Sequence, residues 1–323
     1  MTQSNTHNER KQQLEAVLMQ TDGVCSVSVN DDDKGLCIKV SNANANATIS
    51  LFGGHVLSYI PASSNKDVLW LSSQAIFDSK SPIRGGIPVC WPWFAAYNSS
   101  NFDNALANTN NLPSHGFLRT QFWQLLELKE TQEHNKVVET TLRLRPTNID
   151  VYDAYKDMDV ILELTIGSDL TVSLITQNKG EENIQITQAL HTYFQVDNVQ
   201  STIVEGVSEN YDDKPSATKN NTTALPYVFQ EEVDRIHYLN NAKANTAQVI
   251  HLVDHKHSMR QQIENYGNDS VVIWNPWQEK SVSMNDMADD GYCSMVCIEA
   301  ANTKATTIGP GETFTLTQLV KGQ

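Results

Sequence analysis

The chain has 323 residues, of which 40% are hydrophobic and 19% are charged. This composition supports a sizeable core and excludes general disorder. With 38 acidic against 23 basic residues and a formal net charge of −15, nucleic acid is not an expected partner, and no apolar run reaches the roughly 18 residues of a membrane span. An anionic ligand would therefore need a local basic site, against the field of the whole chain.

The first 22 residues predict a short N-terminal helical extension. Thr6 and Glu9 have the spacing of a capping box, and Leu14, Val17 and Leu18 then fall on one face of a helix. The segment has no apolar stretch of the kind that a signal peptide needs. We therefore expect a cytoplasmic protein.

The five cysteines are odd in number and widely spread along the chain. Cys293 and Cys297 lie four positions apart, but no second pair completes the spacing of a zinc site. Reduced and mostly buried thiols are the expected state, and we expect no bound metal and no cofactor. The other cysteines are Cys25, Cys37 and Cys90.

The rest of the chain has the pattern of short strands separated by turns. Val160, Leu162 and Leu164 occupy alternate positions, a Gly-Ser-Asp turn follows, and the alternation resumes at Leu170, which predicts a β-hairpin. Almost nothing between the strands has a helical period. We therefore predict an all-β fold, a large antiparallel β-sandwich that forms one domain over residues 1–323. Further strands are expected at 47–52, 137–145, 183–194, 270–275, 294–300 and 313–320.

Two glycine-bearing loops each contain one arginine. SPIRGGIPVCWPWF at 81–94 contains Arg84, and SHGFLRTQFW at 114–123 contains Arg119. Proline and glycine give such loops defined shapes, and a guanidinium group suits phosphate or carboxylate oxygens. A structural salt bridge is the alternative for either arginine. His115, in the second loop, is a candidate to bind a sugar hydroxyl or the backbone.

Two further residues are candidates for proton transfer. Within 183–194, alternation places His191 on the face opposite Ile186 and Leu190. We expect that face to be polar and partly open, so that the histidine titrates near neutrality. Glu299 ends a mostly apolar run, which predicts partial burial with a paired carboxylate or a shifted pKa. The alternatives are a surface histidine and a salt-bridged structural carboxylate.

Other segments are weaker candidates. Asp234 lies in an expected loop, where an Asp-Arg step usually forms a local ion pair. His251, His255 and His257 could share one strand face and bind a metal, but a solvated edge or loop is the favoured interpretation. Residues 98–114 are rich in Asn and Ser and predict a long surface loop. The sequence lacks HExxH, GxSxG, GxGxxG and GxxxxGK[ST], so the commonest metalloprotease, hydrolase and nucleotide motifs are unsupported.

Six segments make the chain resemble a known family. In order, they are SPIRGGIPVCWPWF, SHGFLRTQFW, QALHTYF, EEVDRI, VIWNPW and MVCIEAAN. Together they resemble the glucose-6-phosphate 1-epimerases, also called hexose-6-phosphate mutarotases, of the aldose 1-epimerase superfamily. The resemblance covers roughly residues 35–320. It implies a large antiparallel β-sandwich with the sugar in an open cleft, and a reaction that needs no metal, nucleotide or redox cofactor.

The resemblance also implies roles for individual residues. Glu299 would remove the proton of the C1 hydroxyl and His191 would protonate the ring oxygen, which opens the ring so that it can reclose on the other face. The implied substrate-binding residues are Arg84, Ser114, His115, Arg119 and Asp234. Some members of the family carry Gln where this chain has Ser114.

Two other functions stay open at this point. One is an aldose 1-epimerase for free sugars, against which the two loop arginines argue because a neutral sugar does not call for them. The other is a non-catalytic carbohydrate-binding protein, since folds of this type host many functions. His191 and Glu299 argue against it, because binding alone needs no acid/base pair. We expect a monomer whose partner is a small-molecule sugar phosphate, with no membrane association.

Overall fold

The strands form three sheets. The computed structural model describes residues 3–19, 26–102, 106, 111–239, 246–254, 256 and 259–322. Within these residues there is one sheet of four strands, one of eight and one of nine. Neighbouring strands run antiparallel, as in β8–β9, where Leu162 faces Leu174. The predicted all-β antiparallel fold is confirmed.

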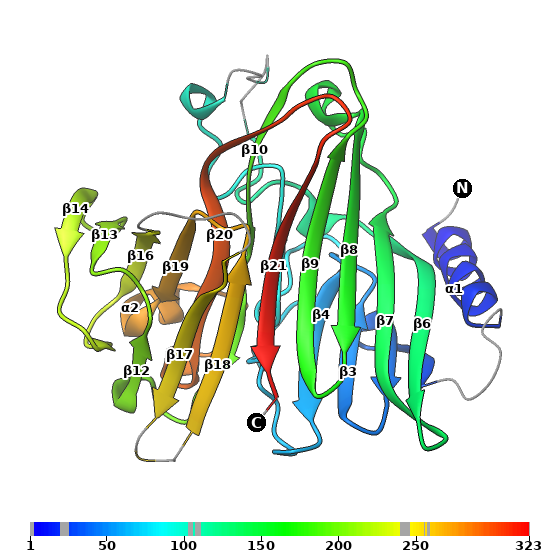
Figure 1. Ribbon diagram of the computed structural model, residues 1–323, viewed down its shortest axis with the longest axis horizontal. Helices are drawn as coiled ribbons and strands as arrows, with labels where there is room; N and C mark the ends of the chain where they lie inside the picture. The colour runs from blue at the N-terminus through cyan, green and yellow to red at the C-terminus, as the bar shows by residue number, and fades with distance from the viewer. Residues whose placement is uncertain are drawn as a thin grey trace.

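The nine-stranded sheet lies at the front of the view in Figure 1. Its central hairpin, β8 with β9, is the one that the alternation of Val160, Leu162 and Leu164 predicted. In the order of the sheet, the strands are β15 (Tyr227–Val228), β12 (Thr202–Glu205), β17 (Gln248–Asp254), β18 (Met259–Tyr266), β21 (Thr313–Lys321), β9 (Asp169–Asn178), β8 (Met158–Ile166), β7 (Lys136–Pro146) and β6 (Trp123–Glu133).

The other two sheets complete the sandwich. The four-stranded sheet contains β1 (Val27–Asp32), β2 (Gly35–Ser41), β3 (Ala45–Ser50) and β4 (His55–Pro61) in that order. The eight-stranded sheet has the order β14 (Thr218–Thr222), β13 (Asn210–Asp213), β16 (Val233–Tyr238), β19 (Ser270–Asn275), β20 (Met295–Ile308), β10 (Ile184–Leu190) and β5 (Val89–Cys90), and β11 (Tyr193–Gln195) also pairs with β20.

One main hydrophobic core joins the three sheets. Ile38 of the four-stranded sheet, Leu162 of the nine-stranded sheet and Ile298 of the eight-stranded sheet all belong to it, and each is fully buried. Burial of this apolar surface is the dominant favourable term in folding. The eight-stranded sheet therefore turns one face toward the core and leaves the other face for different side chains.

Strand β20 shows this division most clearly. Val296 and Ile298 belong to the main core. Successive side chains of a strand point to opposite faces, so Cys297 and Glu299 lie on the outer face, where Cys297 packs in a separate small cluster. Glu299 reaches this face because it follows Ile298 by one position in a regular strand.

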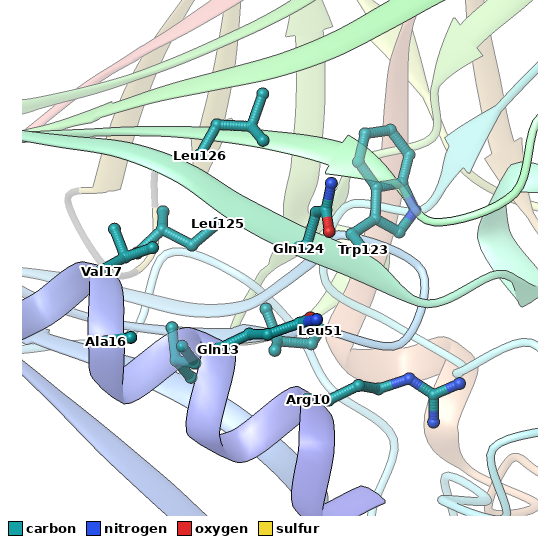
Figure 2. A pocket seen from close by; sticks show the side chains of 10 residues that line it. Arg10, Gln13, Ala16, Val17, Leu51, Trp123, Gln124, Leu125 and Leu126 are labelled. Carbon is teal, nitrogen blue, oxygen red and sulfur yellow. The ribbon is translucent and has the colours of Figure 1, made fainter. Parts of the chain in front are cut away.

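The N-terminal helix α1 (Gln3–Met19) packs beside β6. Thr6 and Glu9 lie inside the helix rather than at its start, so the predicted capping box is wrong. The expected apolar face is confirmed, because Leu14 is buried and Val17 and Leu18 pack against the core. Figure 2 shows the hollow of about 330 Å³ between α1 and β6, with the side chain of Arg10 at one end.

Helix α2 (Trp277–Ser283) was not expected from the sequence. Its seven residues make about two turns, which is too short for a helical period to be recognised. Short 3₁₀ helices occupy Ser99–Asn101, Leu118–Thr120, Asp153–Tyr155, Val199–Ser201 and Gly291–Ser294. Positions 103–105 and 107–110 of the Asn-rich segment lie outside the described residues. No helix in the described part of the chain is long and apolar enough to cross a membrane.

Candidate active site

A break in the sheet places His191 beside Glu299. Strand β10 ends with Leu190 opposite Ala300 of β20, and β11 begins with Tyr193 opposite Cys297. The two residues between these strands therefore lie next to the stretch of β20 that contains Glu299. The face predicted for His191 is confirmed, since its ring stacks on that of Tyr193, with centroids 5.0 Å apart.

The imidazole and the carboxylate are in direct reach of each other. His191 Nε2 lies 3.4 Å from Glu299 Oε1, and the two side chains are 11% and 1% exposed. The surface-histidine alternative and the expectation of a partly open position for His191 are therefore wrong. The expectation of a polar face is confirmed, since Glu299 and Asp234 share it with apolar side chains such as Val272. A sequence pattern predicts which face a side chain takes, but not what covers that face.

Two buried atoms of this pair lack a hydrogen-bond partner among the described residues. They are Nδ1 of His191 and Oε2 of Glu299. Unpaired buried polar atoms are costly and uncommon in native proteins. The purely structural alternative for Glu299, a carboxylate satisfied by a salt bridge, leaves this cost unexplained.

Burial shifts the pKa values of both groups toward their neutral forms. It lowers the pKa of His191 well below its usual value, and the positive charges of Arg119 and Arg84 act in the same sense. It raises the pKa of Glu299 well above its usual value, while the charge of Lys214 acts against the rise. The direction of the His191 shift is therefore contrary to the expectation that this residue titrates near neutrality. Both shifts favour a protonated carboxyl group and a neutral imidazole.

Aromatic rings fix the orientation of the imidazole. Besides Tyr193, the ring of Trp274 meets His191 edge to face at a centroid distance of 6.0 Å, and the ring of His115 does so at 5.5 Å. His115 in turn contacts Phe94 at 5.0 Å. Packing of this kind restricts rotation of the ring, so that its two nitrogens keep their directions.

Arg84 is held beside the pair by two side chains. Its Nε donates to Asp286 Oδ2 at 3.1 Å, its Nη2 lies 3.1 Å from the same oxygen, and its Nη1 donates to the Tyr193 hydroxyl at 3.0 Å. Tyr193 and Asp286 raise the pKa of Arg84 above its usual value. The loop shape depends on Gly86, whose φ is +61° and where an added Cβ would lie 2.2 Å from the Val56 carbonyl oxygen.

Arg119 comes from the second glycine-bearing loop. Gly116 has φ of +69°, and an added Cβ there would lie 1.9 Å from the Trp91 carbonyl oxygen. Arg119 Nη2 donates to the carbonyl oxygen of Ser114 at 2.7 Å. Ser114 thus holds Arg119 through its backbone, while His115 accepts a 3.3 Å hydrogen bond at Nδ1 from the Ala95 N–H. The loop brings all three predicted residues, Ser114, His115 and Arg119, to the same side of the site.

The local ion pair expected for Asp234 is wrong. Asp234 lies in strand β16 and not in a loop, because Val233–Tyr238 pairs with both β13 and β19. Neighbours in a strand point to opposite faces, so Arg235 pairs with Asp213 at 2.8 Å while Asp234 pairs with Lys214 at 3.0 Å. No pattern around position 214 had singled out Lys214 as a site residue.

Asp286 was also missed. It lies 202 positions from Arg84, in an acid-rich stretch that resembles an ordinary solvated loop in the sequence. Only the fold brings the two together, and the Asp286 carbonyl is itself held by the Ser72 hydroxyl at 2.7 Å. No local pattern would have found either Lys214 or Asp286.

The sequence also offered three histidines as a weaker candidate for a metal site. His251 is on β17 of the nine-stranded sheet, and His255 and His257 lie outside the described residues. Among the residues that the structure does describe, no three His, Cys, Asp or Glu side chains are grouped as metal ligands. Of the cysteines, Cys37, Cys90 and Cys297 are free and buried and Cys293 is free and partly buried. Cys25 falls outside the described residues.

The chain is similar to several known proteins. Residues 36–321 match the family described as aldose 1-epimerase. A protein of Escherichia coli K12, provisionally named a glucose-6-phosphate 1-epimerase, is 33% identical over 275 residues, which is 83% of this chain and 84% of that protein. A protein of Cenchrus ciliaris with the same provisional name is 31% identical over 278 residues, 83% of this chain and 79% of that protein.

Solved structures show the same fold. A crystal structure described as a provisional mutarotase from Salmonella typhimurium has a TM-score of 0.78 and 28% identity, and the match covers 91% of this chain and 92% of that one. A galactose mutarotase related enzyme from Lactobacillus acidophilus has a TM-score of 0.63 at 15% identity, covering 88% and 96% of the two chains. This second likeness concerns the fold alone.

Proposed function

The chain belongs to the aldose 1-epimerase family and is an isomerase, and we propose that it interconverts the α and β anomers of a hexose 6-phosphate, with glucose 6-phosphate as the first candidate. One observation carries the proposal. A buried acid/base pair, His191 and Glu299 at 3.4 Å, lies beside a preoriented arginine. The provisional names of the relatives point to the same substrate.

Arg84 has the hydrogen-bond capacity that a phosphate group requires. A guanidinium group has five N–H donors in a fixed fork. Three of them contact Asp286 or Tyr193, so one on each η nitrogen has no partner among the described residues. Two such donors suit two phosphate oxygens. Arg119, whose charge also acts on His191, supplies a second cation.

The proposed reaction needs one base and one acid. Glu299 takes the proton of the C1 hydroxyl while His191 gives a proton to the ring oxygen, and the bond between C1 and that oxygen breaks to leave an open-chain aldehyde. Rotation about C1–C2 presents the other face of the carbonyl. As the ring closes, His191 takes its proton back from the ring oxygen and Glu299 gives its proton to the C1 oxygen, so the pair is unchanged at the end.

Binding of the substrate can convert Glu299 and His191 to the charged forms that this reaction requires. Burial favours a protonated Glu299 and a neutral His191, and the charges of Arg119 and Arg84 further disfavour a charged imidazole. A phosphate dianion bound by these arginines offsets their charge. The proton can then pass from Glu299 to His191 over the 3.4 Å between Oε1 and Nε2. The contacts remote from C1 would thereby contribute to the reaction and not only to binding.

The test compares two sugars. Anomer exchange is followed by NMR saturation transfer for glucose 6-phosphate and for glucose, with and without the protein. We expect strong acceleration for the phosphate ester and little for glucose. Equal acceleration of both sugars would move the assignment to an aldose 1-epimerase for free sugars, and no acceleration of either would favour a carbohydrate-binding protein.

We also propose that the chain acts as a single-domain monomer in the cytoplasm. Buried free thiols such as Cys90 and Cys297 suit a reducing compartment. Light scattering coupled to size exclusion should give a mass near 36.1 kDa at working concentrations. A mass of twice that value would contradict the monomer, and recovery in an oxidising compartment after cell fractionation would contradict the location.

A further inference from the structure

We propose that Lys214 is a substrate-binding residue, and that it and Asp234 together bind the adjacent C2 and C3 hydroxyls of the sugar on the Glu299 side of the site. This inference rests on the proposed function and names a side chain that binds hydroxyl groups of the sugar ring.

The register places Lys214 and Asp234 on one face of the sheet. Asp213, the last residue of β13, is opposite Arg235 of β16. Lys214 follows, and its N–H donates to the Asp234 carbonyl at 3.0 Å. Alternation then separates two ion pairs, Arg235 with Asp213 on one side and Lys214 with Asp234 on the other.

The Lys214 side of the sheet is the side that contains the acid/base pair. Asp234 is opposite Trp274 of β19, whose ring contacts His191. Lys214 Nζ lies 4.6 Å from the centroid of Phe94, and Phe94 contacts His115, which contacts His191. Both members of the ion pair are thus one or two side chains from the imidazole.

The ion pair has capacity left for a ligand. The side chains of Lys214 and Asp234 are 32% and 19% exposed, so each is partly open. An ammonium group has three donors and a carboxylate has two acceptor oxygens. The contact at 3.0 Å joins Nζ to Oδ1. A donor and an acceptor held side by side match two neighbouring hydroxyl groups, each of which can accept and donate.

The charges divide the site into two ends. Arg119 and Arg84 are the strongest charged influences on the pKa of His191, whereas Lys214 and Asp234 are the strongest on that of Glu299. In a pyranose, C6 is attached beside the ring oxygen, while C2 and C3 follow C1 around the other edge. With the phosphate at the arginines and C1 at Glu299, the C2 and C3 hydroxyls point toward Lys214 and Asp234.

Substrate analogues that lack one hydroxyl test the contact directly. The efficiency kcat/KM of anomer exchange is measured for wild type and Lys214→Met with glucose 6-phosphate, 2-deoxyglucose 6-phosphate and 3-deoxyglucose 6-phosphate. We expect Lys214→Met to lose about tenfold on the parent sugar, as for a hydrogen bond to a charged group. The penalty for the deoxy analogues should then be much smaller in the variant than in wild type, because the partner of the missing hydroxyl is already gone.

Two controls keep the outcome clear. Lys304 also lies over an aromatic ring, 4.6 Å from the centroid of Tyr238, but it is outside the site. Lys304→Met should therefore have the same kcat/KM as wild type. Lys214→Arg keeps the cation and should recover part of the loss. An unchanged deoxy penalty for both analogues in Lys214→Met would overturn this inference while leaving the proposed function in place. Failure of wild type to turn over glucose 6-phosphate would instead overturn the proposed function itself.

Discussion

The two faces of the eight-stranded sheet use the same strands for different purposes. On the inner face of β20, Val296 and Ile298 are fully buried in the main core. On the outer face, Glu299 is 1% exposed yet leaves an oxygen without a hydrogen-bond partner among the described residues. One face lowers the free energy of the fold, and the other contains a group whose burial raises it.

This difference suggests how the fold supports an ionisable pair in an apolar setting. Burying an unsatisfied carboxyl group costs free energy, and single-residue alternation lets the opposite face of the same strand offset that cost. If so, substitutions on the outer face should change activity with little loss of stability, and substitutions on the inner face should do the reverse.

The largest effect is expected for His191→Gln, on the outer face. Loss of the proposed proton donor to the ring oxygen should lower kcat by about 10²–10⁴-fold. The melting temperature should change little, since Nδ1 of His191 bonds to none of the described residues. Saturation-transfer NMR and thermal unfolding measure the two quantities. A large loss of stability with normal kcat would reverse the comparison.

The matching substitution on the inner face is Ile298→Ala. It leaves a cavity in the core and should lower the free energy of unfolding by about 2–5 kcal/mol, while the activity per folded molecule stays near that of wild type. Urea denaturation and exchange kinetics at low temperature test both parts. Loss of activity in fully folded protein would show that the two faces are not independent.

A smaller effect is expected at the phosphate end of the site. Arg84→Ala should raise KM for glucose 6-phosphate by about 10–100-fold, as for loss of charge-assisted hydrogen bonds. Free glucose should be affected little, because it has no phosphate. Arg235→Ala, which removes an arginine from the opposite face of β16, is the control. Equal losses on both sugars would mean that Arg84 acts structurally.

The smallest effect is expected for the pH dependence of stability. It concerns His237, which lies on the face of β16 opposite Asp234. Burial lowers its pKa to about 4 from the usual 6.5. The folded protein therefore binds this proton less readily than the unfolded chain, and stability falls as pH drops from 6.5 toward 4. At pH 5.5 this difference in pKa lowers the free energy of unfolding by about 1.4 kcal/mol. Unfolding of wild type and His237→Gln against pH should show a shallower slope in the variant; identical slopes would contradict the assignment.

Local patterns in the sequence predicted much of the fold. The strand expected at 270–275 is β19, and the alternation in 160–176 is the β8–β9 hairpin. Alternation also gave the correct face for His191. Element boundaries that depend on capping, and short helices, were predicted less well. The earlier start of α1 and the unexpected α2 show this.

The site itself depended on long-range pairing. The resemblance to a family selected His191 and Glu299, and the structure places them side by side, while their roles in the reaction stay predictions. Lys214 and Asp286 were missed because each meets its partner only through the order of the strands or a distant loop. The burial of His191 was missed for the same reason, since the rings of Trp274 and His115 come from other segments.

Glu299→Gln provides the most direct test of the central claim, that the outer face contains a proton-transferring pair and not a structural carboxylate. Anomer exchange of glucose 6-phosphate is measured by saturation transfer, and binding of the same sugar is measured by calorimetry. We predict that exchange falls by at least about 10²-fold while binding and the melting temperature stay close to those of wild type. Exchange at the wild-type rate in a folded, sugar-binding Glu299→Gln protein would contradict the claim.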